Sequence, residues 1–246
     1  MQVRLSPLHR GHYTARLAQD AADHASALAL RTRAFQTDHA DSDAFDEVCA
    51  HVVIEDTRTQ HVVCCFRMMF LEGGGELCHS YSAQFYDLEP LVHFPGRMVE
   101  LGRFCIDPAY NDPDILRIAW GAMTRCVDEN RVEMLFGCSS FAGTETADYL
   151  DAFAMLKARY LGPKRWLPQV KAPDVFRFAA RLRRVPDARK AMLGMPPLLK
   201  TYLMMGGWVS DHAVVDRQMN TLHVFTGVEI GAIPAARKRV LRAVVG

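Results

Sequence analysis

The chain has 246 residues, of which 50% are hydrophobic, and a formal net charge of +1. This length supports one large domain or two small ones with a sizeable core, and the balanced charge argues against a nucleic-acid-binding protein. The seven cysteines are odd in number and show no C-x-x-C spacing, so we expect neither a disulfide framework nor a metal site. The sequence shows no apolar leader and no window of about 20 apolar residues, which predicts a cytoplasmic protein.

The first predicted elements are a helix and a β-hairpin. Residues 21–35 are rich in alanine and leucine, which is typical of a helix, and the polar stretch 36–47 is typical of a loop. Two apolar, β-branched runs follow over 51–55 and 61–71. Because a short polar connection joins these runs, they predict two antiparallel strands.

A strand, a helix, a second strand and a second helix come after the hairpin. Residues 99–106 predict a strand, and Asp112 followed by Pro113 predicts a helix start, since aspartate is a good N-cap and proline suits the first helical position. A strand over 132–137 and a helix over 146–161 come next. This order predicts an α/β (α+β) fold in which helices flank a mixed central sheet.

The remaining chain is less regular, with a basic stretch and then an apolar one. A strand is predicted over 221–226 and a basic helix over 235–242. We expect a single domain over 1–246, with a core over about 10–162 and a basic and apolar C-terminal part over about 163–246.

Two opposite charges, Glu100 and Arg103, lie in the otherwise apolar predicted strand V-E-L-G-R-F-C-I. In a regular strand their side chains point to opposite faces. Gly102 between them is a signal for a bulge, which would bring both charges to one face. A structural interpretation is that Arg103 pairs with Asp43 or Asp46 to hold a loop, and a functional one is that both charges meet a substrate.

A scattered set of residues resembles the pattern of bacterial acyl-carrier-protein-dependent N-acyltransferases related to the GNAT fold, including the N-acyl-homoserine-lactone synthases. In that pattern an arginine and a phenylalanine end the first helix, two aspartates lie in the next loop, and an arginine, a glutamate and an arginine lie in the two following strands. The matching residues are Arg31, Phe35, Asp43, Asp46, Arg67, Glu100 and Arg103. The loop lacks the tryptophan of the lactone synthases, which argues against that activity.

The sequence resembles more closely, over nearly the whole chain, the ornithine-lipid Nα-acyltransferases, which are also called hemolysin-like acyltransferases. The matching blocks include S-Y-S-A-Q-F-Y-D-L, L-F-G-C-S-S-F-A-G-T and P-P-L-L-K-T-Y-L-M-M-G-G-W-V. This resemblance implies transfer of a 3-hydroxyacyl chain from acyl carrier protein to the α-amine of L-ornithine, which gives lyso-ornithine lipid. The alternatives are the same reaction on glutamine or another amino acid, and a non-catalytic module that binds acyl carriers or membranes.

N-acyl transfer from a thioester needs a base for the α-amine and stabilisation of an oxyanion, but no metal or redox cofactor. Glu100 is the first candidate base, and Asp46 and Arg103 are further candidate catalytic residues. Asp43 and Asp46 are alternative bases, or they hold the cationic end of the acceptor. Arg67 and Arg103 either bind the acceptor carboxylate or lock these acids.

Five further residues complete the predicted substrate site. They are Arg31, Phe35, Ser139, Ser140 and Tyr149. In many GNAT enzymes a tyrosine protonates the leaving thiolate, and Tyr149 is the candidate for this role here. The alternative for Tyr149 is a buried tyrosine on a helix.

The segment after the charged strand predicts the acyl donor. GNAT enzymes that use coenzyme A carry a glycine-rich loop there, whose amides hold a pyrophosphate at a helix N-terminus. The stretch A-Y-N-D-P-D-I-L has acids and proline instead, which favours a donor carried by acyl carrier protein. No cofactor of the protein's own is then expected, because the phosphopantetheine arrives on the carrier.

The carrier and the membrane are the expected macromolecular partners, and no nucleic acid is expected. Between Lys157 and Lys190 there are eleven bases and two acids, which suits an acidic carrier protein or anionic lipid head groups, although a solubilising surface is the alternative. Candidate docking residues are Lys157, Arg159, Lys164, Arg165 and Lys171. The apolar residues 196–205 are candidates for an acyl-chain tunnel, a contact with the inner membrane, or core packing.

Overall fold

The structure is a computed structural model that describes residues 3–243. These residues form two compact units. Unit 1 contains the described residues up to Phe70, Val99–Val132 and the described residues from Ala235 onward, and unit 2 contains Leu71–Met98 and Glu133–Pro234. The organisation of 1–246 as a single domain stays a prediction.

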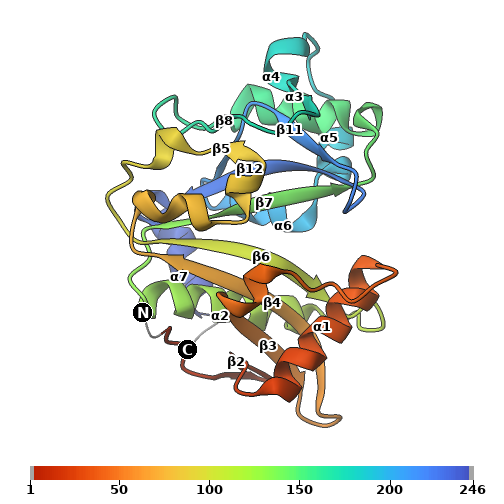
Figure 1. Ribbon diagram of the computed structural model, residues 1–246, viewed down its shortest axis with the longest axis vertical. Coiled ribbons are helices and arrows are strands. Elements are labelled where there is room, and N and C mark those ends of the chain that lie inside the picture. Colours follow the sequence, from red (N-terminus) through yellow and green to blue (C-terminus); the bar gives the residue numbers. More distant parts are fainter. Residues whose placement is uncertain (1–2, 244–246) are drawn as a thin grey trace. The chain divides into compact units, whose positions relative to one another are not determined.

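Unit 1 is built on strands in the order β1, β2, β3, β4 and β6 (Figure 1). Their bounds are β1 Leu8–Arg10, β2 Tyr13–Leu17, β3 Ala50–Asp56, β4 His61–Leu71 and β6 Met98–Ile106. Strands β3 and β4 pair antiparallel, which confirms the predicted hairpin. The short strands β1 and β2 were not predicted from the sequence, because polar and basic residues interrupt their apolar alternation.

Three α-helices belong to unit 1. They are α1 Ala21–Phe35, α2 Pro113–Glu129 and α7 Ala235–Ala243. Asp20 and Asp112 cap the N-termini of α1 and α2 with their carboxylates, as the sequence predicted for Asp112. Helix α1 covers one face of the sheet through a buried cluster that includes Leu30, Val53 and Cys65, and α2 lies on the opposite face (Figure 1).

Unit 2 contains a second group of strands, in which β7 pairs antiparallel with β12, β12 with β11, β11 with β9, and β10 with β12. Their bounds are β7 Met134–Ala142, β9 Val175–Phe176, β10 Trp208–Val209, β11 Ala213–Asp216 and β12 Thr221–Glu229. A separate antiparallel pair consists of β5 Tyr86–Asp87 and β8 Gln169–Val170. The helices are α3 Leu150–Arg159, α4 Phe178–Arg181, α5 Ala188–Gly194 and α6 Pro197–Met204.

The core of unit 2 lies between its strands and α3, α5 and α6. Phe141 and Phe153 are in ring contact at its centre, with centroids 5.0 Å apart. Leu199 and Leu203 belong to the same buried cluster, so the segment 196–205 takes the core-packing alternative, although Met204 remains exposed. The predicted helix over 146–161 is a 3₁₀ turn, η5 Thr146–Tyr149, followed by α3.

Over the described residues, no helix has both the length and the apolar character needed to cross a bilayer.

Candidate functional site

The acidic loop after α1 turns sharply around a short 3₁₀ helix, η1 Ala44–Glu47. The Asp43 carboxylate accepts a hydrogen bond of 2.9 Å from the Phe45 amide, and the Asp46 carboxylate accepts one of 3.0 Å from the Asp43 amide. This reciprocal capping box satisfies amides that a helix start leaves without partners. It also brings two carboxylates of the loop close together.

Three arginines and three aspartates of unit 1 form a closed ring of ion pairs, which we call the arginine–aspartate ring. Arg31 contacts Asp41 at 2.7 Å and Asp46 at 2.5 Å. The second arginine, Arg67, contacts Asp46 at 2.7 Å and donates two hydrogen bonds to Asp43, of 2.6 and 2.8 Å. The third, Arg103, lies 3.1 Å from both Asp41 and Asp43.

The ring ties the end of α1, the acidic loop, β4 and β6 together. Arg31 and Arg67 are only 1% and 3% exposed. Burying such charges is unfavourable unless they are paired and hydrogen-bonded, and here each arginine meets two aspartates. The sequence analysis identified every member except Asp41, and the ring gives Arg31, a predicted substrate residue, a structural function.

The carboxylates of the ring are held in their charged form. Burial by itself raises the pKa of Asp46, but hydrogen bonds from Arg31, the Asp43 amide and Arg67 outweigh it and lower that pKa to about 2. The pKa of Asp43 is also lowered, because its hydrogen bonds from Arg67 and the nearby Arg103 outweigh burial. Acids of such low pKa accept protons poorly near neutral pH, which argues against Asp43 and Asp46 as the catalytic base.

Strand β6 departs from a regular strand at Arg103, whose φ is 52°, in the left-handed region. A side chain at Gly102 would point toward Arg67, with its Cβ 3.5 Å from the Arg67 Nε. Glu100, two residues earlier in the strand, therefore points toward the same face, where Arg103 reaches Asp43. The irregularity predicted near Gly102 is present, and its left-handed residue is Arg103.

Glu100 is buried, at 5% exposure, and lies on the face of the sheet that carries the ring. The Glu100 charge also acts on Cys49. Burial is the main cause that raises the pKa of Cys49 to about 12; the Glu100 charge raises this pKa further, and the Arg67 charge lowers it. Cys49 therefore stays a thiol near neutral pH. The sequence analysis missed this cysteine, since nothing in its neighbourhood along the chain marks it.

His51 supports the ring from β3. Its Nε2 lies 3.1 Å from the Asp46 carbonyl oxygen and 3.7 Å from an Asp46 carboxylate oxygen. Burial lowers the pKa of His51, so the neutral imidazole prevails near pH 7. Phe35 packs nearby in the apolar cluster under α1 that contains Cys65 and Cys105, rather than in the ring.

Carboxylates occupy the N-terminus of α2, the place where the sequence analysis found acids and proline instead of a glycine-rich loop. Asp112 accepts hydrogen bonds from the Asp114 amide at 2.9 Å and from the Tyr13 hydroxyl at 3.0 Å. Asp114 pairs with Arg10 at 3.0 Å and with Arg117 at 2.7 Å. A free pyrophosphate at this helix end would meet two carboxylates, which opposes its binding.

The predicted site residues Ser139, Ser140 and Tyr149 lie in unit 2. Ser139 is buried and accepts a hydrogen bond of 2.9 Å from the Thr226 hydroxyl, whereas Ser140, its neighbour on β7, is exposed. The Tyr149 hydroxyl donates to the Ala142 carbonyl at 2.7 Å, and its ring packs on Phe141. The structure therefore gives Ser139 and Tyr149 packing and hydrogen-bonding contacts within unit 2.

The predicted docking bases differ in how far their side chains are engaged. Lys157 donates to the Leu182 carbonyl and Lys171 to the Ala83 carbonyl, each at 2.6 Å. Arg165 packs over the Trp166 ring and lies 3.9 Å from Glu229. Within residues 3–243, neither Arg159 nor Lys164 has a side-chain hydrogen bond or ion pair.

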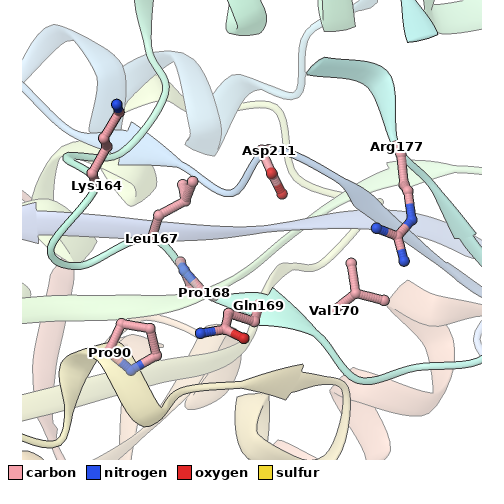
Figure 2. Close-up of a pocket in the computed structure, with 8 residues that line it drawn as sticks. All are labelled: Pro90, Lys164, Leu167, Pro168, Gln169, Val170, Arg177 and Asp211. Atoms are coloured by element: carbon pink, nitrogen blue, oxygen red, sulfur yellow. The ribbon is translucent and has the colours of Figure 1, made fainter. Parts of the chain in front are cut away.

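Unit 2 also contains a pocket with a volume of about 510 Å³ (Figure 2). Its lining residues are Pro90, Lys164, Leu167, Pro168, Gln169, Val170, Arg177 and Asp211. Figure 2 shows Lys164 and Arg177 near opposite ends of this pocket, with Asp211 between them and Leu167 close to Lys164. Cationic, anionic and apolar side chains all line this pocket.

Among the residues that the structure describes, no three side chains of the types that ligate metals come together as a metal site.

Comparisons with known proteins identify similar sequences and a similar fold. The family model for the acetyltransferase (GNAT) domain matches residues 24–121, which include the ring and Glu100. The chain is 31% identical to the L-ornithine N(alpha)-acyltransferase of Rhodobacter capsulatus, over 86% of this chain and 88% of that protein. It is 30% identical to the protein of the same name from Brucella abortus, over 87% of this chain and 83% of that protein.

The fold is similar to that of FeeM, an N-acyl amino acid synthase from uncultured soil microbes. The TM-score is 0.52 at 8% identity, over 89% of this chain and 92% of the FeeM chain. At this identity the likeness concerns the fold alone. The two relatives and the family model show that the chain is an N-acyltransferase with a GNAT domain and belongs to the L-ornithine Nα-acyltransferase family.

Proposed function

We propose that this N-acyltransferase transfers a 3-hydroxyacyl chain from acyl carrier protein to the α-amine of L-ornithine, giving lyso-ornithine lipid. The single observation that carries the reaction is the position of Glu100, a buried carboxylate on the face of β6 that carries the ring. The name of the matched relatives supports ornithine as the acceptor. A carrier-protein donor also agrees with a reaction in the cytoplasm.

In the proposed mechanism, Glu100 takes a proton from the α-ammonium of the acceptor. The neutral amine then attacks the thioester carbonyl carbon, so that a C–N bond forms and the carbonyl oxygen becomes an oxyanion. Collapse of this tetrahedral intermediate breaks the C–S bond. The phosphopantetheine thiolate leaves on the carrier and takes up the second proton, which the attacking nitrogen releases as it becomes the amide nitrogen, and no covalent acyl-enzyme forms.

The outer edge of the ring is the proposed contact for the charged groups of the acceptor. Asp43 and Arg103 have the most exposed side chains of their kind in the ring, at 25% and 13%. Asp43 is suited to the side-chain ammonium of ornithine, and Arg103 to the acceptor carboxylate. Because both are already paired in the ring, they present charges whose positions are set before the acceptor binds.

The donor proposal is supported by the α2 N-terminus, where Asp112 and Asp114 oppose binding of a free pyrophosphate. A carrier protein offers a single phosphodiester and an acidic surface instead. Among the candidate docking bases, Lys164 is the most suitable, since it lines the unit 2 pocket.

The variant Lys164→Gln tests this docking residue. If Lys164 binds the carrier, the variant raises the KM for the acylated carrier several-fold and leaves the KM for ornithine unchanged.

The test of the proposed function is a competition among acceptors. Purified protein is incubated with 3-hydroxyacyl carrier protein and an equimolar mixture of free amino acids, and the products are identified by mass spectrometry. Acylated ornithine as the main product supports the proposal. If glutamine or another amino acid is acylated instead, the proposed reaction holds but the proposed acceptor is wrong. A parallel reaction with a known acyltransferase checks that the donor is active. If the donor passes this check and no amino acid is acylated, both the proposed donor and the proposed acceptor are wrong.

A further inference from the structure

Three large apolar side chains of unit 2 lie exposed in one short stretch of the chain. Val185 is 90% exposed, Leu193 is 75% exposed and Met192 is 46% exposed. Val185 precedes α5, and Met192 and Leu193 lie in its last turn. Both α4 and α5 pack on α3, so the core of unit 2 supports this stretch (Figure 1).

The local structure explains why these side chains face outward. The Asp187 carboxylate caps α5 by accepting hydrogen bonds from the Arg189 and Lys190 amides, of 2.9 and 3.0 Å. Ala191 is fully buried in the unit 2 core and sets the inward face of the helix. Met192 and Leu193, the next two residues, therefore turn away from that core.

Exposed basic residues flank the exposed apolar ones along the chain. Residues 181–193, which we call the basic–apolar surface, contain five bases and a single acid. The bases are Arg181, Arg183, Arg184, Arg189 and Lys190. All five are exposed, and the one acid, Asp187, is engaged in capping α5. Arg184 also pairs with Asp151 of α3 at 2.8 Å, and the surface retains an excess of positive charge after this pairing.

We propose that the basic–apolar surface docks this enzyme on an anionic phospholipid bilayer. The bases meet the lipid phosphates, and Val185, Met192 and Leu193 enter the boundary between head groups and acyl chains. The proposal rests on the proposed function only for the reason why docking is useful: an acylated amino acid is an amphiphile, which partitions into a nearby bilayer. It names a surface different from the segment 196–205, whose apolar residues are mostly buried.

Projecting side chains distinguish a bilayer from an acidic protein partner. An acidic carrier meets exposed bases equally well, but side chains exposed to 90% and 75% would need complementary pockets on its surface. A fluid bilayer accommodates them without such pockets. Charge and shape together therefore favour the bilayer.

The test is co-sedimentation of the full chain with vesicles, which needs no turnover. Vesicles of phosphatidylcholine with phosphatidylglycerol are compared with vesicles of phosphatidylcholine alone. We expect binding to the anionic vesicles only, weakened by salt. Leu193→Ser with Val185→Ser should weaken it by about tenfold, and Arg189→Gln with Lys190→Gln by about tenfold.

Two matched controls belong to this test. Met204→Ser removes an exposed apolar side chain of α6, and Arg237→Gln with Arg239→Gln removes the same charge from α7. Both should leave vesicle binding nearly unchanged. Equal loss in the controls, or absence of binding to anionic vesicles, would overturn the proposal. So would unchanged vesicle binding together with a raised KM for the acylated carrier, which would assign the surface to the carrier.

Failure of this proposal is separable from failure of the proposed function. Acyl transfer from carrier protein to ornithine is measured in the absence of vesicles for the same variants. If the proposed function holds, all four retain turnover there. Circular dichroism of each variant confirms that a loss of vesicle binding does not come from unfolding.

Discussion

The arginine–aspartate ring of unit 1 and the basic–apolar surface of unit 2 use the same residue type in opposite environments. In the ring, each buried arginine is matched by aspartates, so the group as a whole carries no net charge. On the surface, five exposed bases lie in a stretch with a single acid, and most of their charge remains available to a partner. Matched arginines thus hold the structure in one region, while an excess of exposed ones provides binding in the other.

The largest expected effect comes from breaking the ring. Arg67→Ala leaves Asp43 and Asp46 without a cation that donates three hydrogen bonds to them. We expect the free energy of unfolding to fall by about 3–5 kcal/mol, as for other buried pairs that lose one partner. Denaturation in urea measures it. The control is Arg217→Ala, which removes an exposed pair with Asp174 and should change stability by less than about 1 kcal/mol. Similar losses for both variants would contradict the comparison.

The next expected effect concerns turnover rather than stability. Glu100→Gln removes the proposed base but keeps the size of the side chain, so kcat should fall by about 10²- to 10⁴-fold. Steady-state kinetics with acylated carrier protein measures it, with Glu47→Gln in the exposed part of η1 as the control. Full turnover in Glu100→Gln would exclude this residue as the base.

Acid should weaken the ring before it affects the basic–apolar surface. The pKa of Asp46 falls from 3.8 to about 2 in the folded chain, and that of Asp43 is lowered as well. Because the folded state then binds fewer protons than the unfolded one, this stability is present above pH 3.8 and is lost as the pH falls toward about 2. Asp46 alone should contribute roughly 2 kcal/mol.

Unfolding in urea at a series of pH values between about 5 and 2 checks this expectation. The free energy of unfolding should depend less steeply on pH in Arg67→Ala, because that variant loses a cause of the lowered pKa values of Asp43 and Asp46. An unchanged slope would show that other carboxylates control the acid response.

The smallest expected effect is at Cys49. Because its pKa is raised to about 12, this residue is a thiol and not a nucleophile near neutral pH. Cys49→Ser should therefore change kcat by less than about threefold, and intact-mass measurements during turnover should show no acyl-enzyme. An acylated Cys49 would replace direct attack by a two-step mechanism.

Much of the site was predictable because its signals are local. Gly102 indicated an irregular strand, and the structure places a left-handed residue at Arg103 beside it. The acidic loop and Arg67 were identified through the pattern of a known family. Asp41 was missed, because an aspartate in a polar loop has no distinguishing feature until the chain brings Arg31 and Arg103 to it.

The sequence by itself determined the helices α1 and α2, the β3–β4 hairpin and the excess of bases between Lys157 and Lys190, since periodicity, caps and composition are properties of neighbouring residues. The tertiary structure alone decided that three arginines and three aspartates close into a ring. It also decided that Leu199 and Leu203 of the apolar segment 196–205 lie in the core, whereas Val185 and Leu193 face outward. The physical reason is that pairing and burial depend on residues far apart in the chain, whose approach only the folded packing sets.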